Sequence, residues 1–500
     1  MSPETAVVER ARALPRVIQG GMGVGVSSWQ LARTVAQNGG LGVVSGVAND
    51  LMLARWLQDG DADGVLQSVI AEFPDQDYAQ AVVARYLGKA GRPGKARYRP
   101  IPRLDHHQRL EAVRLTVLGA FVQVRLAKRG HDRPIGINLL EKIQIWTPAT
   151  LYGAMLAGVD VVLVGAGVPT NIPRALNDLA AGRPMRLPID VTDGQAASIS
   201  LDPDGLIAGA PRELTRPVFL AIISSHILAG YLARDPVTTP DGFVVEGPTA
   251  GGHNAPPRRP EVDDNGEVVF GPRDVVDLDK VAKVGLPFWL AGGRGTPEGL
   301  REALELGAHG VQIGTVFALS RESGLTPPLR QVLFESATGG DLHVRTDAKA
   351  SPTGFPFKVV PMPGTIAVDE VRADRERLCD LGYLRELYQR EDGTIATRCP
   401  SEPVDAYVHK GGTVENTEGR YCLCNGLTAS AGIGQVRADG YAEAPLLTLG
   451  HELDAAKRLK TLHPDGWNAS DVMEWLTAPP PADRVQECPA YTSDRATASS

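Results

Sequence analysis

Two short apolar runs that each end in glycines dominate the sequence near residue 300: FWLAGG at residues 288–293 and GVQIGT at residues 310–315. Residues 298–306, between them, have the length and pattern of a helix. The order strand, glycine loop, helix, strand and glycine turn is typical of the end of a (β/α)8 barrel, where such loops commonly form a phosphate site. Because glycines let main-chain N–H groups approach a phosphate closely, this stretch predicts a phosphorylated cofactor at the top of a barrel.

The same alternation of strands and helices extends through the first 325 residues. Residues 15–19 and 41–45 predict two strands, and Ser27 or Ser28 can cap a helix over residues 29–37 between them. Continuous apolar runs of this kind are typical of parallel strands buried on both faces. Eight strands in this alternation predict an α/β fold, a (β/α)8 TIM barrel. The six further strands are expected at residues 134–140, 161–164, 218–223, 242–246, 287–290 and 311–313.

The chain is much longer than a minimal barrel, which needs roughly 250 residues, because it has 500. We expect the barrel to occupy residues 1–330, with a helical insertion at about 49–130 and a hairpin insertion at about 186–213. Residues 331–500 contain all five cysteines and are expected to form a C-terminal extension that wraps the barrel.

Composition and charge exclude some classes of protein. A net charge of −8 and a pI near 5.8 argue against a general binder of nucleic acids or anionic membranes. No apolar run approaches the roughly 20 residues that span a bilayer, and the first residues lack the pattern of a signal peptide. The low cysteine density favours a cytoplasmic location. We therefore expect a cytoplasmic enzyme with a small-molecule substrate, and the sequence leaves open whether it forms a homo-oligomer.

Six motifs within residues 15–325 resemble motifs of the nitronate monooxygenase (2-nitropropane dioxygenase) family of FMN-dependent barrels, and they occur in the same order as in that family. That superfamily also includes flavin-dependent enoyl reductases of fatty-acid and polyketide synthesis, which share the motif order. The motifs are IQGGMG (18–23), LGVVSG (41–46), INL (137–139), AGGH (250–253), AGG (291–293) and VQIGT (311–315).

The resemblance implies that the chain binds FMN. Gly21 and Met22 would lie against the isoalloxazine ring, and Asn138 would hydrogen-bond the flavin or its ribityl chain. The late glycines would supply main-chain donors to the phosphate. The full set of residues expected to bind the cofactor is Gly20, Gly21, Met22, Ser45, Asn138, Gly251, Gly252, Gly292, Gly293, Gly314 and Thr315.

His253 is the residue that the resemblance implies as catalytic. It directly follows a predicted barrel strand and a glycine pair, and in the family the equivalent histidine acts as base or acid toward the substrate carbon. An imidazole suits proton transfer because its unperturbed pKa is about 6.5. Next along the chain, Arg258 and Arg259 either grip a carboxylate or a nicotinamide-dinucleotide phosphate or are simply solvated.

Four cysteines of the extension suggest a second site. Cys422 and Cys424 form a Cys-x-Cys pair, which on a strand places both sulfurs on the same side. Together with Cys379 and Cys399 they would make a four-thiolate site for zinc or an iron–sulfur cluster. The alternative is buried, inert thiols packed as small hydrophobes. Residues 351–358 predict either a lid over the flavin or a packed connecting strap.

Two flavin-dependent functions follow from these observations. The first is oxidation of alkyl nitronates with O₂ by a nitronate monooxygenase-like oxidoreductase, with FMN as the redox group. The alternative is an NAD(P)H-dependent FMN enoyl reductase that acts on an acyl chain, with NAD(P)H as co-substrate. A third reading is a barrel enzyme without flavin, such as an aldolase-like enzyme.

Overall fold

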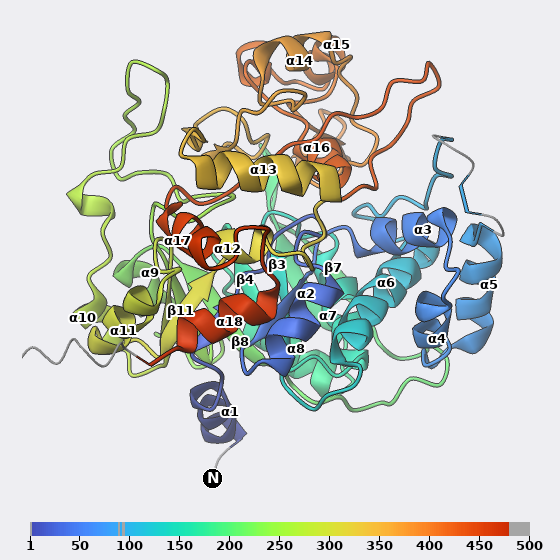
Figure 1. The fold of residues 1–500 in the computed structure, drawn as a ribbon. Helices are drawn as coiled ribbons and strands as arrows, with labels where there is room; N and C mark the ends of the chain where they lie inside the picture. Colours follow the sequence, from blue (N-terminus) through green and yellow to red (C-terminus); the bar gives the residue numbers. More distant parts are fainter. Residues whose placement is uncertain (1–2, 89–90, 93–95, 480–500) are drawn as a thin grey trace, which may run out of the picture.

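The computed structural model, which describes residues 3–88, 91–92 and 96–479, contains a closed barrel of eight parallel strands (Figure 1). The sheet order is β1-β11-β10-β9-β8-β4-β3-β2. A parallel bridge between Ile18 and Leu41 joins the two outer strands of this order and closes the barrel. The predicted (β/α)8 barrel is therefore confirmed. The strands are β1 (Val17–Gln19), β2 (Gly42–Ser45), β3 (Ile135–Leu140), β4 (Val161–Gly165), β8 (Val218–Ile223), β9 (Gly242–Glu246), β10 (Phe288–Ala291) and β11 (Gly310–Ile313).

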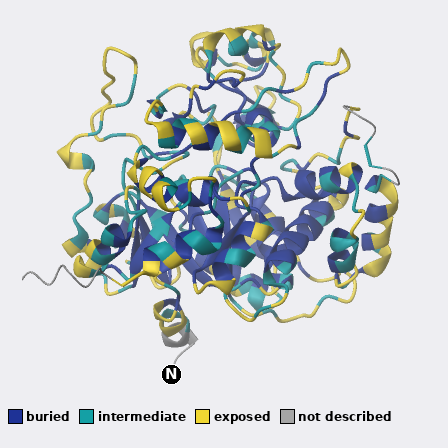
Figure 2. Ribbon diagram, viewed as in Figure 1, coloured by how far each residue is buried: buried dark blue, intermediate teal, exposed yellow. Residues whose placement is uncertain are grey.

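Side chains fill the inside of the barrel. The interior cluster includes Ile18, Val43, Leu163, Leu220 and Trp289, which are fully buried. Figure 2 shows the strands as the most buried part of the molecule. Since the lumen is packed, a ligand can bind only at the rim.

Helices surround the barrel and cover its amino end. The first helix, α1 (Pro3–Arg12), lies below the strands (Figure 1) and contributes Ala11 to the interior cluster. Ser28 caps α2 by accepting a hydrogen bond from the Leu31 amide (3.0 Å). The helices between the strands are α2 (Trp29–Gln37), α6 (Leu110–Lys128), α7 (Thr147–Leu156), α8 (Ile172–Ala180), α9 (His226–Leu232), α10 (Leu278–Ala282) and α11 (Pro297–Glu305).

Two insertions interrupt the barrel. The first lies between β2 and α6 and consists of three helices, α3 (Asn49–Asp59), α4 (Val65–Ile70) and α5 (Gln76–Tyr86). Helix α6 itself packs against α2 and α7 as a barrel helix. Between α8 and β8, the strands β5 (Met185–Ile189) and β7 (Ala197–Leu201) form an antiparallel hairpin. The short strand β6 (Val191–Thr192) pairs with β14 (Glu386–Gln389), so the hairpin contacts the extension.

After β11, the chain from α13 (Pro327–Gly339) to α16 (Leu423–Ser430) lies over the carboxyl end of the barrel, opposite α1 (Figure 1). The last described helix, α18, packs against both α2 and α11 and so takes the position of an eighth barrel helix. The helix that directly follows β11, α12 (Thr315–Ala318), is too short for that position. The other elements are α13 (Pro327–Gly339), β12 (Arg345–Asp347), β13 (Phe357–Val359), α14 (Asp369–Asp374), β15 (Ile395–Arg398), α15 (Val404–His409), α16 (Leu423–Ser430), α17 (Asp454–Leu462) and α18 (Ala469–Thr477).

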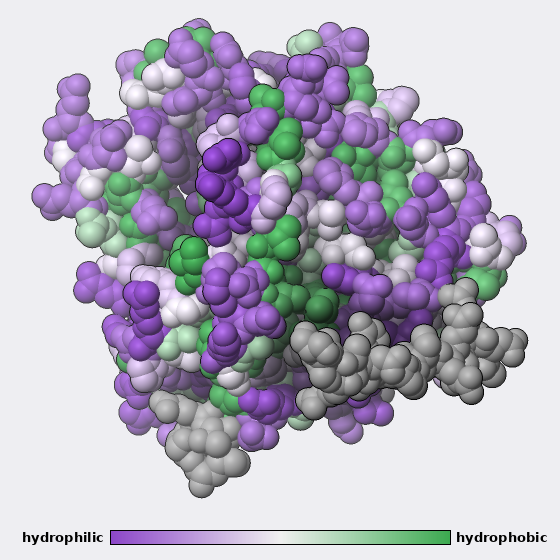
Figure 3. All heavy atoms as spheres, turned by 90° about the vertical axis from the view of Figure 1, so that its left-hand side faces the viewer, coloured by the Kyte–Doolittle hydropathy of each residue, from purple (hydrophilic) through white to green (hydrophobic). Residues whose placement is uncertain are grey.

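The surface of the described residues is mostly hydrophilic. Figure 3 shows polar side chains over most of one side of the molecule, with hydrophobic residues in small groups between them. Among the described helices, none combines the length and apolar character that crossing a membrane requires.

The close approach of β11 to the main chain at Arg16, where the barrel closes, can be tested by substitution. A Cβ atom added at Gly310 would lie 1.8 Å from the main-chain oxygen of Arg16, so the adjoining backbone would have to move. We expect Gly310→Ala to destabilise the protein by about 1–3 kcal/mol, measured as a lower midpoint of thermal unfolding. Gly230→Ala, on α9 with open space at its Cβ position, is the matched control and should leave the midpoint unchanged or raise it. Equal midpoints for the two variants would contradict this account of the closure.

Candidate active site

A cavity of about 490 Å³ opens at the carboxyl ends of the barrel strands. This volume is within the usual range for small-molecule sites. The structure brings together nearly all of the residues that the sequence analysis expects to bind a cofactor, although their binding role stays a prediction. Those that line the cavity are Gly20, Gly21, Met22, Asn138, Gly251, Gly252, Gly292, Gly293, Gly314 and Thr315, together with His253.

The loop after β1 is held by side-chain hydrogen bonds. The Ser27 hydroxyl accepts from the Met22 amide (2.7 Å) and donates to the Gly20 carbonyl (2.9 Å). Gly21 must be glycine because an added Cβ would lie 2.1 Å from Cβ of Asn138. Ser45, which was expected at the cofactor, is buried and is not among the described residues that line the cavity; its amide donates to the Ser27 carbonyl (3.1 Å). Ser45 therefore supports the loop after β1 from outside the cavity.

The two late glycine loops form the other end of the cavity. Gly292 and Gly293 have φ angles of 92° and 67°, which only glycine adopts readily. Arg294 and Arg458 line the same end, each paired with a glutamate of α11 at 2.5 and 2.8 Å. Two carboxylates, Glu452 and Asp454, also line it. An anion bound here would therefore meet two cations and two acids, and main-chain donors would have to supply much of its stabilisation.

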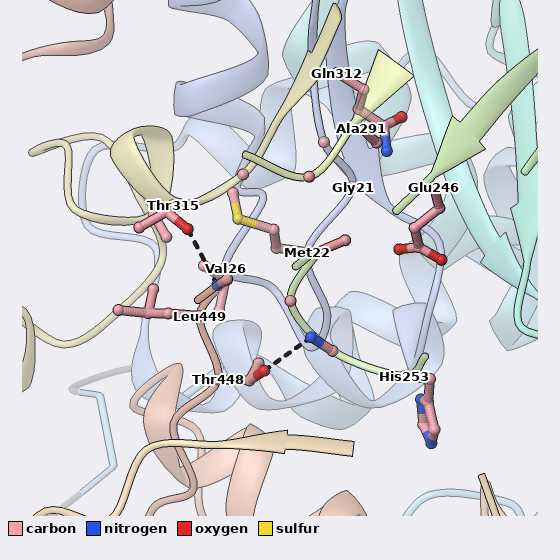
Figure 4. A pocket seen from close by; sticks show the side chains of 18 of the residues that line it. Gly21, Met22, Val26, Glu246, His253, Ala291, Gln312, Thr315, Thr448 and Leu449 are labelled. Atoms are coloured by element: carbon pink, nitrogen blue, oxygen red, sulfur yellow. Dashed lines mark hydrogen bonds between the residues drawn. The ribbon is translucent and has the colours of Figure 1, made fainter. Parts of the chain in front are cut away.

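Part of the predicted phosphate site is occupied by the extension (Figure 4). The Gly252 amide donates to the Thr448 hydroxyl at 2.9 Å, and the Gly450 amide donates to the Thr315 hydroxyl at 3.1 Å. Residues 448–450 thus lie between the loops after β9 and β11. Because the Gly252 amide already has a partner, Gly251, Gly292, Gly293 and Gly314 are the predicted late glycines left to offer amides to an anion.

His253 is fixed by the segment 351–358. Its Nε2 atom lies 2.7 Å from the Ser351 hydroxyl, and its ring packs edge-on against Phe357, with the centroids 4.8 Å apart. Burial, together with the nearby Lys142 cation, lowers the pKa of His253 to about 4. The imidazole is therefore neutral at physiological pH. The segment itself is a packed strap through β13, and its Phe357 also forms a wall of the cavity.

Glu246, which the sequence analysis did not propose, is a further ionisable group that lines the cavity. It is the last residue of β9, and Figure 4 shows its carboxyl on the same side of the cavity as His253. Burial raises the pKa of Glu246 to about 8, against the opposing effect of the Lys358 cation. The carboxyl is thus protonated at neutral pH. Its place at the carboxyl end of a barrel strand was the signal that could have identified it.

The extension supplies further groups around Glu246 and the cavity wall. Lys358 is completely buried, and its ammonium donates to the Thr346 hydroxyl at 2.5 Å. Burial lowers the pKa of Lys358 to about 8, while Glu246 and Glu267 oppose that shift. Tyr383 lines the cavity and donates to Asp50 Oδ1 at 2.7 Å. The contact between Tyr383 and Asp50 joins residues 333 positions apart, so the local sequence pattern contained no signal for it.

Two polar side chains that line the cavity each have an atom without a hydrogen-bond partner among the described residues, whereas the two arginines that follow His253 lie outside it. Asn138 Oδ1 and Gln312 Oε1 belong to lining residues, and within the described chain neither has a hydrogen-bond partner. Buried polar atoms without partners are costly, so these two are suited to contact a ligand. Arg258 and Arg259 are exposed and lie outside the residues that line this cavity.

The predicted metal site is wrong for the described cysteines Cys379, Cys399, Cys422 and Cys424, because no group of three or more His, Cys, Asp or Glu side chains there is arranged to hold a metal ion. The Cys-x-Cys pair begins helix α16 instead of lying on a strand. Helical residues two positions apart point in different directions. Accordingly, Cys424 lines the cavity, whereas Cys422 Sγ contacts Asn425 Nδ2 at 3.4 Å. Cys488 lies outside the described residues.

The electrostatics of His253 can be tested by titration. Removing the Lys142 cation with Lys142→Met should raise the pKa of His253 from its value near 4, because a positive neighbour disfavours the imidazolium. The measurement is an NMR pH titration of ring-labelled histidine. Lys349→Met is the matched control, since this lysine is exposed and pairs with Glu418. An unchanged His253 titration in Lys142→Met would contradict the assigned cause.

Comparison with known proteins finds a match to one part of the chain. Residues 218–349, which contain β8 to β11, match the family model of nitronate monooxygenase. A nitronate monooxygenase from Pseudomonas aeruginosa is 39% identical over 121 residues, which are 24% of this chain and 32% of that protein. The matched stretch thus spans about a third of the relative's length.

Three solved structures are similar at low identity. FabK from Thermotoga maritima is 17% identical with a TM-score of 0.48, over 95% of this chain and 94% of that one. The enoyl reductase domain of MlnA from Bacillus amyloliquefaciens is 12% identical with a TM-score of 0.49, over 94% and 95%. Nitroalkane oxidase from Streptomyces ansochromogenes is 17% identical with a TM-score of 0.42, over 92% and 94%. The barrel assignment does not depend on them, because it follows from this chain's own strand order. Residues 218–349, which match the nitronate monooxygenase family model, carry Glu246, His253 and both late glycine loops.

Proposed function

We propose that this chain is an FMN-dependent oxidoreductase that oxidises alkyl nitronates with O₂. The observation that carries the proposal is that one cavity joins the glycine loop after β1, Asn138, His253 and the late glycine loops. These groups come from separate barrel units, and their convergence at the carboxyl rim is typical of a barrel active site.

The residues present fit a flavin. Asn138 Oδ1 and Gln312 Oε1 are partner-free acceptors among the described residues, suited to the N–H groups of a flavin ring. At the other end, Gly292, Gly293 and Gly314 with the side chain of Arg294 would hold the phosphate. When bound, FMN would supply the redox chemistry, and the protein would supply binding, orientation and electrostatics.

The state of His253 favours a nitronate over a neutral nitroalkane. An imidazole whose conjugate acid has a pKa of about 4 is a weak base, poorly suited to remove a proton from carbon. A nitronate has already lost that proton. Neutral His253 and protonated Glu246 can instead donate hydrogen bonds to its negative charge.

The second candidate is an NAD(P)H-dependent enoyl reductase that acts on an acyl chain. The protonated carboxyl of Glu246 favours it, because reduction of a carbon–carbon double bond needs a proton donor near the substrate. The apolar wall formed by Leu140, Ile143, Leu384 and Leu427 suits an acyl chain as well as an alkyl nitronate.

Anaerobic reduction of the bound flavin distinguishes the two candidates. With propionate 3-nitronate, NADH and NADPH tested in parallel, we expect rapid bleaching of flavin absorbance by the nitronate alone. His253→Ala should slow that reduction by about 10²-fold or more while FMN stays bound. Rapid reduction by a nicotinamide alone would establish the second candidate, and a purified protein that binds no FMN would exclude both.

The pH profile tests Glu246 independently of the flavin assignment. Because its pKa is raised to about 8, the carboxyl is protonated below that pH and loses its proton above it. We expect kcat/KM for nitronate oxidation to fall as the pH rises through about 8. The Glu246→Gln variant, whose side chain cannot ionise, should lack this decline. Glu305→Gln, on the exposed end of α11, should keep the wild-type profile. If Glu246→Gln shows the same decline, another group is responsible.

A further inference from the structure

A second cavity, smaller than the active-site cavity, adjoins Glu246. Its volume is about 30 Å³. The parallel register of β8 and β9 brings Ser224, which follows β8, beside Glu246, the last residue of β9. Both residues line the second cavity. Of the described residues, Glu246 alone lines both cavities, so it separates one from the other.

The outer wall of the second cavity reaches the surface. Arg258, one of its lining residues, is exposed, and Asp274, another, is half-buried. The main-chain amides of Arg258 and Gly271 each donate to one oxygen of the Asp274 carboxylate, both at 2.7 Å. These hydrogen bonds hold the loop after His253 against the turn at Pro272–Asp274. The cavity thus extends from the carboxyl end of β9 to the edge of the solvent.

Asn254 supplies an unsatisfied acceptor in the wall of this cavity. The residue is only 3% exposed. Its main-chain amide donates to the Pro356 carbonyl at 2.9 Å, and its Nδ2 atom donates to the Ala250 carbonyl at 3.2 Å. Its Oδ1 atom has no hydrogen-bond partner within the described chain. Because a buried acceptor without a partner is costly, this atom is suited to bind a small donor in the cavity.

Water is the small molecule whose size and bonding match this cavity. A buried water needs roughly 10–15 Å³ of space and two to four polar partners. A cavity of about 30 Å³ therefore has room for about two waters. Phe270 forms an apolar part of the wall. The polar groups of the lining include the carboxyls of Glu246 and Asp274, the Ser224 hydroxyl and Asn254 Oδ1.

We propose that the second cavity binds ordered water and that this water carries protons between Glu246 and the solvent, with Asn254 as the residue that positions it. In each transfer the carboxyl O–H bond of Glu246 breaks as an O–H bond forms on the adjacent water, which passes one of its other protons outward. A proton from the solvent returns to the carboxylate by the reverse steps. Each water ends with two hydrogens, and no electron is transferred.

The charge state of Glu246 agrees with this role. Burial raises its pKa to about 8, so the carboxyl holds a proton at neutral pH. Lys358 opposes that shift, and its ammonium lies 5.6 Å from the ring centroid of Phe270, which lines the second cavity. The charged side chains that line the second cavity itself are Arg258 and Asp274.

A separate path to solvent matters during turnover. A cofactor and a substrate in the large cavity would cover the side of Glu246 that faces it. Water in the second cavity would leave Glu246 in contact with solvent from its other side, so the carboxyl would lose or regain a proton while the large cavity is occupied. The water path would serve nitronate oxidation and enoyl reduction alike, and it belongs to neither reaction alone.

A crystal structure of the full-length protein, at a resolution that shows ordered water, tests the binding site. We expect at least one water in the second cavity within about 3.2 Å of Asn254 Oδ1, with Glu246, Ser224 or Asp274 as a further partner. In Asn254→Leu, whose side chain has a similar size but no acceptor, this water should be lost. A dry cavity in the wild-type protein, or an unchanged water in Asn254→Leu, would overturn the proposal.

Infrared spectroscopy in D₂O tests the proton path. The carbonyl stretch of the protonated Glu246 carboxyl, identified as the band that Glu246→Gln removes, shifts when deuterium replaces the proton. Ala255→Leu places a bulkier side chain in the lining of the second cavity. We expect this variant to slow the exchange by about tenfold or more, because the proton must then wait for a local opening of the loop. Ala282→Leu, at an exposed position of α10, is the matched control and should exchange like the wild type.

The same measurement assigns the role of Asn254. Asn254→Leu should slow the exchange, whereas Asn254→Asp, which keeps an oxygen at the same position, should exchange at a rate near that of the wild type. Equal rates in the wild type, Ala255→Leu and Asn254→Leu would exclude the second cavity as the path. Neither the crystal structure nor the exchange measurement uses a flavin or a nitronate, so failure of the proposed function would leave both results unaffected.

Discussion

The barrel closes where β1 pairs with β11 and, through the Ile18–Leu41 bridge, lies beside β2. Once closed, its interior is filled by side chains such as Trp289 and Leu163, with no room for a ligand. Carboxyl ends of all eight strands then meet at one rim, and the loops that follow them must face each other there. The glycine loops after β1, β10 and β11 come together for this reason, although they are separated by up to about 290 residues in the sequence.

The extension is part of this arrangement. Helix α18 takes the place beside α2 and α11 that the four-residue α12 cannot fill. Thr448 and Gly450 bond the loops after β9 and β11, and Ser351 holds His253. The candidate active site is therefore built jointly by the family-matched residues 218–349 and by residues beyond them. The extension therefore forms part of the cavity wall, together with residues of the barrel.

Burial shifts the pKa values of the ionisable groups around His253 so that the neutral form of each group is favoured. It lowers the pKa of His253 and Lys358 and raises that of Glu246. Around His253 and Glu246, neutral donors in a low-dielectric setting can bind an anion through hydrogen bonds that water would otherwise weaken.

The sequence by itself determined the barrel, its eight strands and the place of the glycine loops. These features are local: an apolar run of strand length, a capping serine and a glycine turn each act within a few residues. His253 followed from the same local pattern and from the family resemblance. Tertiary structure alone decided the charge state of His253, the participation of Glu246 and Lys358, and the contacts of Ser351 and Thr448, because burial and long-range contacts depend on the closed fold. The metal site failed for the same reason: Cys422 and Cys424 begin a helix, and a two-residue spacing places side chains together only on a strand.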